Sequence, residues 1–445
     1  MSLKYIQKLG KEQGFISGLI LMNEKTKYVP TIYIDETRCD GKMACMRICP
    51  TYAIRVKQGA ARIINNLCID CGECIKVCPN KAIKPITNTF KDINSIGPVY
   101  AVASPALYAQ FGKDIHPHLI HEGLRRIGFA GSYDITKYCV ILRRAIERFI
   151  SESKGQKPVI SSHCPVIVSM IEVQFPSLIE NLLPMREPRE LAAIEIKKNL
   201  NNKDAALIYV TPCSAKILDV KSPRWKEGSS IDGALSIRDI YNPLLSAILE
   251  IKNPAAPDIQ IYAEGIEWAA EGGIVDHLPE SVLSLSSSGI ANAKKVLSDI
   301  EFSKLREIDF VELYACDSGC SGGSLVVENT YMARNKIKSI ISLPSMAKDT
   351  IPDYAEVELK REWLGLHTKQ TPVVDLHSAI GKMKDKERIY LNLPKVDCGL
   401  CGCPTCSVFA DDIVNNKASL NECIFEELSQ MKKDFNLIFQ RWKQE

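Results

Sequence analysis

The 445-residue sequence contains no apolar run long enough to cross a bilayer, and it does not open with a charged stretch followed by an apolar segment. We therefore expect neither a membrane span nor secretion, and we place the protein in a reducing cytoplasm. The formal net charge of +3 gives no reason to expect binding to nucleic acid or to an anionic membrane surface. No Walker or Rossmann glycine-rich loop is present, so the sequence does not indicate a nucleotide cofactor.

Cysteine is the most informative residue type in the chain. The 17 cysteines are too few for a small disulfide scaffold and too clustered to be scattered core thiols. In a reducing compartment their thiols stay available to metal. They fall into an N-terminal repeat, three central segments and a C-terminal group. At about 150 residues per domain, the length indicates about three folded units.

The N-terminal group is an internal repeat. Cys39-x5-Cys45-x3-Cys49-Pro50 recurs 29 residues later as Cys68-x2-Cys71-x2-Cys74-x3-Cys78-Pro79. This is the arrangement of bacterial two-cluster ferredoxins, in which three cysteines of one run bind one cluster and the fourth crosses to the other. That rule assigns one complete 4Fe–4S site to Cys68, Cys71, Cys74 and Cys49. A structural zinc ribbon is the alternative.

The second site of the repeat is incomplete. It has Cys39, Cys45 and Cys78, but Lys42 stands where a cysteine is expected. A protonated lysine has no lone pair to offer iron. The site could hold a three-iron cluster, a four-iron cluster with water or Asp40 at the odd iron, or nothing. We predict a cluster with an altered potential, because three soft ligands in a preset loop still bind a cluster well.

The C-terminal group has five cysteines, one more than a cluster needs. It resembles the small iron–sulfur domain that accompanies redox complexes, whose pattern is Cys-x2-Cys-x4-Cys with a fourth cysteine 17 residues further on. Cys398, Cys401, Cys406 and Cys423 match this spacing, which leaves Cys403 as the spare. Zinc is again the alternative, since Cys-x2-Cys pairs also suit tetrahedral zinc.

An apolar stripe follows the last cysteine. Its residues repeat with the spacing 4-3-4-3-4 along one face of a predicted helix: Ile424, Leu428, Met431, Phe435, Ile438 and Trp442. More often than not, such a stripe packs on its own domain. The functional interpretation is a homodimer seam or a docking surface for an electron partner, and three heptads do not decide between these.

Four cysteines in the middle of the chain stand in three segments far apart in sequence. Cys164 and Cys213 each follow an apolar, strand-like run, and Cys316 and Cys320 follow a third such run at 308–314. A helical pattern comes after each segment. This alternation indicates an α/β fold with parallel strands, which places ligands where the strands end. We expect two lobes that meet at one metal site, with the thiol pKa values lowered by helix N-termini.

These three segments resemble the signature segments of the FeFe-hydrogenases. The first ends in Cys164-Pro165, the second reads Pro212-Cys213-x2-Lys216, and the third reads Ala315-Cys316-x2-Gly319-Cys320-x-Gly322-Gly323. Segments 288–292 and 327–334, together with the order of the cysteine groups, resemble the branch of this family often called sensory. The resemblance covers the chain from about Tyr33 to Cys423.

The resemblance implies an H-cluster. The 4Fe–4S half of this cluster would be held by Cys164, Cys213, Cys316 and Cys320. Cys320 would also bridge to the di-iron half, which carries CO, cyanide and an azadithiolate. Lys216 matches the lysine that hydrogen-bonds a cyanide, and Ser104-Pro105-Ala106 resembles the loop that lines the di-iron pocket. The alternative interpretation of Lys216 is a solvated surface lysine.

The departures from the family pattern concern the proton path. Active members usually have a second cysteine before the first ligand, and this chain has His163 there. Imidazole titrates near neutrality and can relay protons, so the substitution need not abolish turnover. Because the ring is bulkier than a thiol and oriented differently, we expect slow turnover; a histidine that only fills the space and bonds to backbone is the alternative. Segment 137–147 shows no clear counterpart to the relay glutamate, and Thr211 and Tyr314 stand where methionines usually flank the site.

Two further features are given no metal role. Cys139 has no cysteine nearby and is predicted to be a core thiol. His116, His118 and His121 lie on one helical stretch, but Pro117 and the cysteine ligands elsewhere argue against a separate histidine metal site.

We therefore expect four parts: an N-terminal extension (1–30), a two-cluster ferredoxin-like α+β domain (31–88), a two-lobed hydrogenase domain (89–385), and a small helical iron–sulfur domain with its amphipathic helix (386–445). The expected activity is slow, sensory H2 oxidation and proton reduction, with His163, Lys216 and Cys320 as catalytic residues. Electrons would pass through the 4Fe–4S clusters to a ferredoxin-like or signalling partner. The alternative is an iron–sulfur electron-transfer or assembly protein with only a 4Fe–4S cluster at the central site.

Overall fold

The computed structural model describes residues 30–90, 97–152, 157–200, 202, 204–254, 258–347, 359 and 376–442. The chain forms two compact units. Unit 1 comprises residues 1–32, 69–72 and 85–367, and unit 2 comprises residues 33–68, 73–84 and 368–445. The predicted N-terminal extension lies outside the described residues, apart from Pro30.

A four-stranded parallel sheet forms one part of unit 1. Its strand order is β6-β5-β8-β9, with β5 at Val99–Ala103, β6 at Gly131–Asp134, β8 at Ala206–Thr211 and β9 at Gly233–Ser236. Every residue of β8 is buried, which is typical of a parallel strand covered on both faces. Because Ala103 pairs with Val210, the carboxyl ends of β5 and β8 lie at the same edge of the sheet.

A three-stranded parallel sheet forms the other part of unit 1. Its strand order is β10-β11-β7, with β7 at Val159–Ile160, β10 at Ser284–Ser288 and β11 at Phe310–Tyr314. Phe310 pairs with Val159, so β7 and β11 run side by side in the same direction. The segments that carry Cys164 and Cys316 therefore leave this sheet at the same edge.

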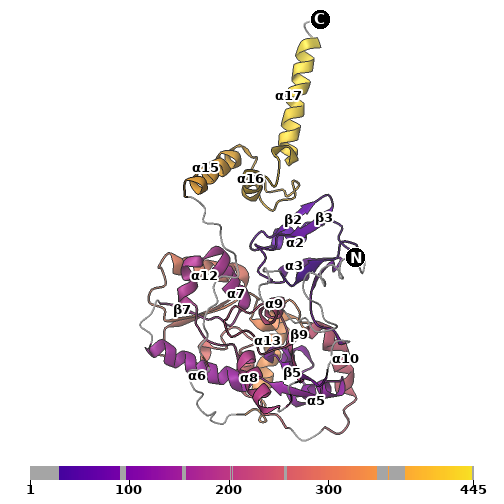
Figure 1. The fold of residues 1–445 in the computed structure, drawn as a ribbon, viewed down its shortest axis with the longest axis vertical. Helices are drawn as coiled ribbons and strands as arrows, with labels where there is room; N and C mark the ends of the chain where they lie inside the picture. Colours follow the sequence, from indigo (N-terminus) through magenta and orange to yellow (C-terminus); the bar gives the residue numbers. More distant parts are fainter. Residues whose placement is uncertain are drawn as a thin grey trace. The chain divides into compact units, whose positions relative to one another are not determined.

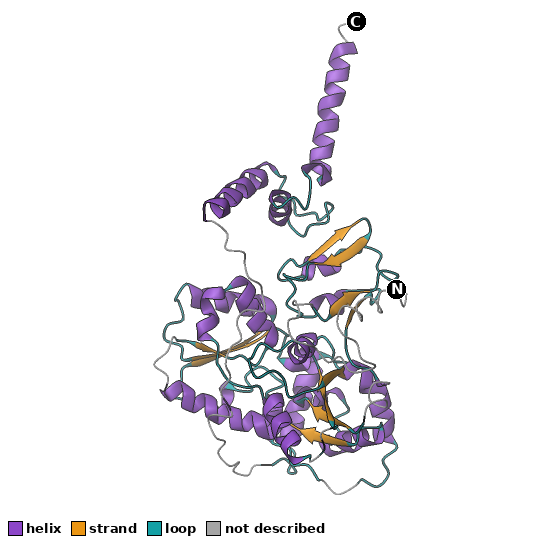
Figure 2. Ribbon diagram, viewed as in Figure 1, coloured by secondary structure: helices purple, strands orange, loops and turns teal. Residues whose placement is uncertain are grey.

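Helices lie around both sheets of unit 1 (Figure 2). Three begin with a proline, whose fixed φ suits the first helical turn: α5 (Pro117–Arg126), α7 (Pro165–Gln174) and α8 (Pro188–Asn199). The other described helices of unit 1 are α6 (Thr136–Glu152), α9 (Ser214–Lys221), α10 (Ile237–Leu249), α11 (Ala263–Glu267), α12 (Ile290–Glu301), α13 (Thr330–Ile341) and the 3-10 helices η1 (Pro105–Gln110), η2 (Pro176–Asn181), η3 (Val275–His277) and η4 (Cys320–Gly322). The predicted α/β fold with parallel sheets is confirmed.

Unit 2 combines two segments that lie far apart in sequence. The N-terminal segment has two two-stranded sheets, β1 (Ile32–Ile34) with β4 (Ile83–Pro85) and β2 (Ile54–Lys57) with β3 (Ala60–Ile63), and the short helices α2 (Ala44–Ile48) and α3 (Glu73–Val77). The C-terminal segment is helical: α15 (Leu376–Asn392), α16 (Cys406–Val414), η5 (Leu420–Glu422) and α17 (Ile424–Trp442). Figure 1 labels most of these elements, among them β2, β3, α16 and α17. Within the described residues, no helix is long and apolar enough to span a membrane.

The two segments of unit 2 are joined by polar contacts around β2. The backbone N–H of Val56 donates to the carbonyl oxygen of Gly402 at 3.0 Å. A Cβ at Gly402 would lie 2.4 Å from the carbonyl oxygen of Val56, so only glycine permits this approach. One residue along β2, Arg55 forms a buried ion pair with Asp412 of α16, with Nε donating to Oδ2 at 2.6 Å and Nη2 to Oδ1 at 3.1 Å.

We expect the substitution Arg55→Met to loosen this junction. It leaves the Asp412 carboxylate buried without its cation, which typically costs about 3–5 kcal/mol. Hydrogen–deuterium exchange of the holoprotein should show faster exchange of the amides in α16. Lys57→Met is the matched control, because the Lys57–Glu422 pair is about one-third exposed and should contribute under about 1 kcal/mol. Equal effects of the two substitutions would contradict the role given to Arg55.

Candidate metal centres

Each of the central cysteines follows a strand of unit 1. Cys164 is the N-cap of α7 after β7, and Cys213 is the N-cap of α9 after β8. Cys316 lies two residues beyond β11, and Cys320 opens the 3-10 helix η4. Gly319 has φ +87°, and a Cβ there would meet the backbone of Ala270 at 2.7 Å. The turn before Cys320 therefore requires glycine.

Burial raises the pKa of two of the central thiols. It raises the pKa of Cys213 to about 12, helped by the neighbouring sulfurs of Cys164 and Cys320. It also raises the pKa of Cys164, with Cys320 as the next cause. The expectation that helix N-termini would lower these values was wrong, because burial and mutual repulsion outweigh the helix dipole. These sulfurs need a compensating positive charge to become thiolates.

Lys216 supplies one such charge. Its side chain is buried, and its Nζ lies 3.5 Å from the sulfur of Cys320. Burial alone would lower the pKa of Lys216, but the sulfur of Cys320 and the Tyr209 hydroxyl outweigh burial and raise it. Within the described part of the chain, no carboxylate lies within ion-pair distance of this ammonium. The alternative of a solvated surface lysine is therefore wrong, and the site is built for an anionic group beside Cys320.

His163 faces the same sulfur. Its Nε2 lies 3.9 Å from the sulfur of Cys320, and its ring meets the ring of Trp268 edge-on at 5.2 Å. Burial, together with the charges of Lys216 and Arg189, holds the pKa of His163 well below its usual value, so its ring is neutral at pH 7. The buried Nδ1 has no hydrogen-bond partner among the described residues. The alternative interpretation of His163 was a space-filling ring that hydrogen-bonds to the backbone. Among the described residues, the His163 ring makes no hydrogen bond to the backbone.

A small pocket of unit 1 opens on the other side of His163. Its polar lining includes Ser161, Ser162, Arg186 and Glu187, and Trp268 also contributes to its wall. The indole Nε1 of Trp268 and the Nε of Arg186 are buried, and neither has a partner within the described residues. Unpaired buried donors of this kind fit ordered water or a small polar ligand.

The loop at Ser104-Pro105-Ala106 leads from β5 into η1. The hydroxyl of Ser104 accepts the backbone N–H of Ala106 at 3.4 Å, and the backbone N–H of Ser104 donates to the carbonyl of Val210 at 3.3 Å. All three residues of the loop are buried. The loop thus lies at the carboxyl edge of the four-stranded sheet, beside the end of β8 that leads to Cys213. Its contact with a di-iron group stays a prediction.

Two buried acids were missed in the sequence. Glu312, in the middle of β11, accepts hydrogen bonds from the Tyr314 hydroxyl at 2.6 Å and from the backbone N–H of Ile274 at 3.2 Å. Burial raises its pKa to about 7. The sequence feature that could have indicated a buried Glu312 is its position as the single carboxylate in the apolar run Phe310–Tyr314. Asp134 ends β6 and accepts the hydroxyl of Tyr108 at 2.5 Å, and burial raises its pKa to about 6.

His121 belongs to the same hydrogen-bond network as Tyr108. Its Nε2 lies 2.8 Å from the Tyr108 hydroxyl, and its Nδ1 lies 2.7 Å from the Ser132 hydroxyl. Both ring nitrogens are thereby used, so His121 holds the structure together rather than a metal. Cys139 is buried in the hydrophobic core, as predicted. Among the described residues, no group of three His, Cys, Asp or Glu side chains is arranged to hold a single metal ion.

The incomplete N-terminal site is assembled within unit 2. Cys39, Cys45 and Cys78 line one pocket together with Asp40 and Lys42. Burial and the other two sulfurs raise the pKa of Cys45 to about 11. Backbone N–H groups point at these sulfurs: Ala61 donates to Cys39 at 3.4 Å and Ala82 donates to Cys78 at 3.3 Å. Such donors stabilise an anionic cluster, so three ligands fit one.

Lys42 is paired inside this pocket. Its Nζ lies 2.9 Å from Oδ2 of Asp40, and both side chains are largely exposed. This contact, with Asn80 nearby, lowers the pKa of Asp40. Asp40 is therefore an ionised oxygen donor paired with Lys42, the residue that stands in place of the missing cysteine.

The four cysteines of the predicted complete ferredoxin-like site do not all belong to one unit. Cys49, Cys68 and Cys74 belong to unit 2, whereas Cys71 lies in the segment 69–72 of unit 1. The backbone N–H of Ala53 donates to the sulfur of Cys49 at 3.1 Å. The grouping of these four cysteines around one cluster stays a prediction.

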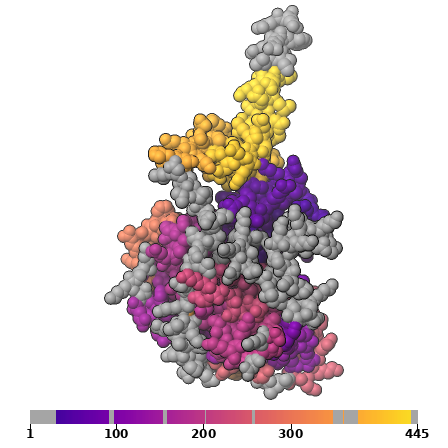
Figure 3. Space-filling view, in the orientation of Figure 1, coloured from indigo at the N-terminus to yellow at the C-terminus, as the bar shows by residue number. Residues whose placement is uncertain are grey.

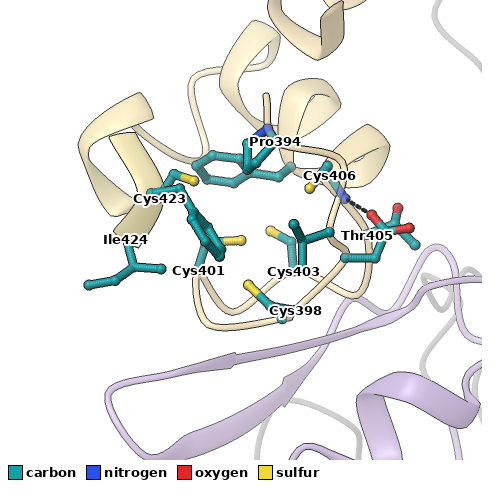
Figure 4. A pocket seen from close by; sticks show the side chains of 13 residues that line it. Pro394, Cys398, Cys401, Cys403, Thr405, Cys406, Cys423 and Ile424 are labelled. Atoms are coloured by element: carbon teal, nitrogen blue, oxygen red, sulfur yellow. Dashed lines mark hydrogen bonds between the residues drawn. The ribbon is translucent and has the colours of Figure 1, made fainter. Parts of the chain in front are cut away.

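The C-terminal cysteines line a pocket of unit 2. Figure 4 shows the sulfurs of Cys398, Cys401, Cys403, Cys406 and Cys423 pointing toward one space. Left-handed glycines shape this loop, with φ +81° at both Gly399 and Gly402. The Asp397 carboxylate accepts the backbone N–H of Cys406 at 2.6 Å and fixes the start of α16. Five cysteines around one space satisfy the ligand demand of a 4Fe–4S cluster with one to spare.

Cys403 is distinguished from the other four by its partner. Its sulfur donates to Oδ2 of Asp412 at 3.3 Å, beside the Arg55 pair. A hydrogen bond with Cys401, burial and the Asp412 charge raise the pKa of Cys403, while the hydrogen bond with Cys403 lowers that of Cys401 to about 6. Cys403 thus stays a thiol and Cys401 becomes a thiolate, which agrees with the spacing argument that left Cys403 as the spare.

Three segments of the chain match known families. Residues 97–278 match the iron-only hydrogenase large subunit, C-terminal domain; residues 31–79 match the 4Fe–4S dicluster domain; and residues 393–425 match an Fe–S cluster family. One part of the chain is therefore similar to the iron-only hydrogenase large-subunit domain, and it lies in sequence between two segments that are similar to iron–sulfur domains. Cys316 and Cys320 lie beyond the matched part of the hydrogenase domain.

The curated relatives are more distant. Iron hydrogenase 1 from Clostridium pasteurianum is 23% identical over 355 residues, which cover 69% of this chain and 61% of that protein. The NADP-reducing hydrogenase subunit HndD from Solidesulfovibrio fructosivorans is 20% identical over 283 residues, which cover 56% of this chain and 47% of that protein. The chain thus spans only about half to three-fifths of the length of these relatives.

Solved structures of FeFe-hydrogenases resemble part of the chain. A variant of HydA1 from Chlamydomonas reinhardtii matches with a TM-score of 0.42 and 17% identity, covering 57% of this chain and 86% of that one. The structure of HydA(deltaEFG), which concerns stepwise H-cluster assembly, matches with a TM-score of 0.41 and 17% identity, covering 56% of this chain and 84% of that one.

Substitution of single cysteines can distinguish the four predicted C-terminal ligands from Cys403, the spare cysteine. We expect Cys403→Ser to keep the C-terminal cluster, because a hydroxyl can still donate to Asp412. Cys398→Ser should lose it, because a serine hydroxyl is a poor ligand for iron. Iron and sulfide content with electron paramagnetic resonance of the reduced protein measures this. Loss of the cluster in Cys403→Ser alone would reverse the assignment.

Glu312 should make stability depend on pH near neutrality. Its folded pKa of about 7 lies above the ordinary 4.5, so its contribution is fully present below pH 4.5 and is lost as the pH rises through 7. Relative to Glu312→Gln, the wild type should lose about 1 kcal/mol between pH 6 and pH 8. Anaerobic thermal unfolding of both proteins at the two pH values measures this difference. Parallel pH curves would exclude the titration of Glu312.

Proposed function

We propose that the protein catalyses the reversible interconversion of H2 with protons and electrons at an H-cluster in unit 1. The observation that carries this proposal is the buried ammonium of Lys216, 3.5 Å from the sulfur of Cys320. A buried cation favours binding of a group that carries negative charge, and the four cysteine sulfurs around it are suitable ligands for iron. The match of residues 97–278 to the iron-only hydrogenase domain supports this choice of group.

The donor set fits the 4Fe–4S half of that cluster. Cys164, Cys213 and Cys316 would be terminal ligands, and Cys320 would be the bridging ligand. When bound, the di-iron half supplies an open iron site and a basic amine for heterolytic splitting of H2. Lys216 would hold this half by a charge-assisted hydrogen bond, and the Ser104-Pro105-Ala106 loop would exclude water from it.

His163 would carry the proton between this site and the pocket behind it. Its Nε2 faces Cys320, and its Nδ1 is buried without a partner, on the ring that lines the pocket with Ser161 and Ser162. A neutral imidazole can accept a proton at one nitrogen and release one from the other. Because burial holds the pKa of His163 well below its usual value, the protonated ring is costly, and proton transfer through it should be slow.

Slow transfer supports a sensory role over a high-flux one. In this role the redox state of the site is read by a partner, which receives electrons through the 4Fe–4S clusters of the ferredoxin-like and C-terminal domains. The Lys42–Asp40 pair at the incomplete cluster site would give that cluster an altered potential. We place the protein in the cytoplasm, because fifteen ligand cysteines need a reducing compartment. The predicted domain boundaries are retained as part of this proposal.

Infrared spectroscopy of the anaerobically matured protein tests the proposal. We expect bands in the CO and cyanide stretching region, and we expect Lys216→Met to lose or strongly weaken them because the cyanide partner is gone. Iron content is the control. If all 4Fe–4S clusters are present and these bands are absent, the protein is an iron–sulfur electron-transfer or assembly protein.

The substitution His163→Cys tests the proton path. A thiol is smaller than the imidazole and restores the family pattern, so we expect the rate of H2 evolution to rise by about tenfold or more while the infrared bands stay. His163→Gln, which keeps a polar side chain of similar size without a titratable group, is the matched control and should lower the rate. A fall in rate for His163→Cys would make His163 an adapted, efficient relay and remove the argument for sensing.

A further inference from the structure

The helix α17 exposes large apolar side chains along one face. Leu428 is 54% exposed, Met431 is 60% exposed and Phe435 is 67% exposed. Figures 1 and 3 show α17 extending from η5, away from α15 and α16 of the same unit. An apolar stripe on a helix is normally covered, so this one indicates an interaction surface.

The spacing of the stripe is that of a two-stranded coiled coil. Ile424, Leu428, Met431 and Phe435 follow one another at intervals of four, three and four residues, which places them alternately at the d and a positions of a heptad. This repeat of 3.5 residues lets two helices keep their stripes together along a left-handed coil. A globular partner would not require such regular spacing.

The charged residues that flank the stripe bear on the identity of the partner helix and on its orientation. Glu427 falls at a g position and Lys432 at the following e position, and both are exposed. In a parallel pair of identical helices, the g position of one helix faces the following e position of the other. Glu427 of each copy therefore faces Lys432 of the other copy, which gives two ion pairs per dimer. In an antiparallel pair g positions face each other, so Glu427 would not face Lys432. The two Glu427–Lys432 ion pairs therefore form only in the parallel pair.

We propose that α17 forms a parallel coiled-coil dimer with α17 of a second copy of this chain. Cys423, a predicted ligand of the C-terminal cluster, directly precedes the first residue of α17. Paired helices lie about 8–10 Å apart, so the dimer holds the two C-terminal cluster sites next to each other at the start of the coil. The coil thereby joins the redox sites of the two copies.

Light scattering of the full-length holoprotein over a range of concentrations tests the dimer. We expect a concentration-dependent dimer, because a coil of about three heptads is weakly stable. Leu428→Asp should abolish it, since an aspartate at an a position cannot be buried. Glu427→Lys and Lys432→Glu should each weaken it by about threefold to tenfold, through loss of two ion pairs. The double variant Glu427→Lys with Lys432→Glu should restore the wild-type dissociation constant.

Glu426→Lys is the matched control, because it makes the same charge change in the same helical turn but at the outward-facing f position. It should leave the dissociation constant unchanged. A wild type that stays monomeric at all concentrations, or a dimer that survives Leu428→Asp, would overturn the proposal. Failure of the double variant to restore the dimer would overturn the parallel arrangement.

Electron paramagnetic resonance gives an independent measurement. In the reduced wild type, we expect broadening from the spin of the neighbouring C-terminal cluster, and this broadening should be lost in Leu428→Asp at unchanged iron content. A spectrum of the dimer that matches the monomeric variant would place the clusters far apart and overturn the proposed geometry. None of these results depends on hydrogenase activity, so they stand or fall separately from the proposed function.

Discussion

Mutual dependence of buried charges organises the centre of unit 1. The sulfur of Cys320 helps to raise the pKa of the buried Lys216 ammonium, whereas burial raises the pKa of Cys164 and Cys213 and favours their thiol forms. Binding of a metal would favour the thiolates, because cysteine ligates metal in its deprotonated form. The strand ends, the Gly319 turn and the loop after β5 bring these groups together while leaving His163 beside Cys320. Unit 2 also contains a buried charge with partners from other parts of the unit. The Asp412 carboxylate pairs with the guanidinium of Arg55 and accepts a hydrogen bond from the Cys403 thiol.

Spacing along the chain was enough to predict the fold class, whereas the set of ligand cysteines stays a prediction. Apolar runs before Cys164, Cys213 and Cys316 predicted parallel strands, and β7, β8 and β11 confirm them. The apolar run Ile259–Ala263 is typical of a strand, but Tyr262 makes only an isolated bridge to Ala347, and α11 begins at Ala263. The pattern from Gly323 to Asn335 is typical of a helix, but the helix begins at Thr330, capped by Asn329. A similar helical pattern at 354–365 lies outside the described residues, apart from Leu359. Short strands such as β6 and β9 were missed because four residues carry too little pattern.

The electrostatics of the site could not be read from the sequence. Whether a thiol pKa rises or falls depends on burial against the helix dipole, and burial is a property of the folded packing. The same holds for His163, whose neighbours Trp268 and Tyr314 come from distant segments. The hydrogen-bond network of Tyr108, His121 and Asp134 joins three elements, η1, α5 and β6, so no local sequence motif predicts it. Residue types and spacing predict which atoms can bind iron, whereas contacts across the fold decide which of them are charged.

The discontinuity of unit 2 has a consequence for how the protein is made. Its N-terminal segment, with β2 and Arg55, leaves the ribosome about 320 residues before Gly402 and Asp412, which complete its packing. Unit 1 lies between them and can fold in the meantime, since domains generally fold as they emerge. The guanidinium of Arg55, which is buried in the folded protein, stays exposed to water until α16 has been synthesised and packs against β2. Packing of α16 against β2 can therefore occur only after the residues up to about Asp412 have been synthesised, and the C-terminal iron–sulfur site is assembled after both segments are present.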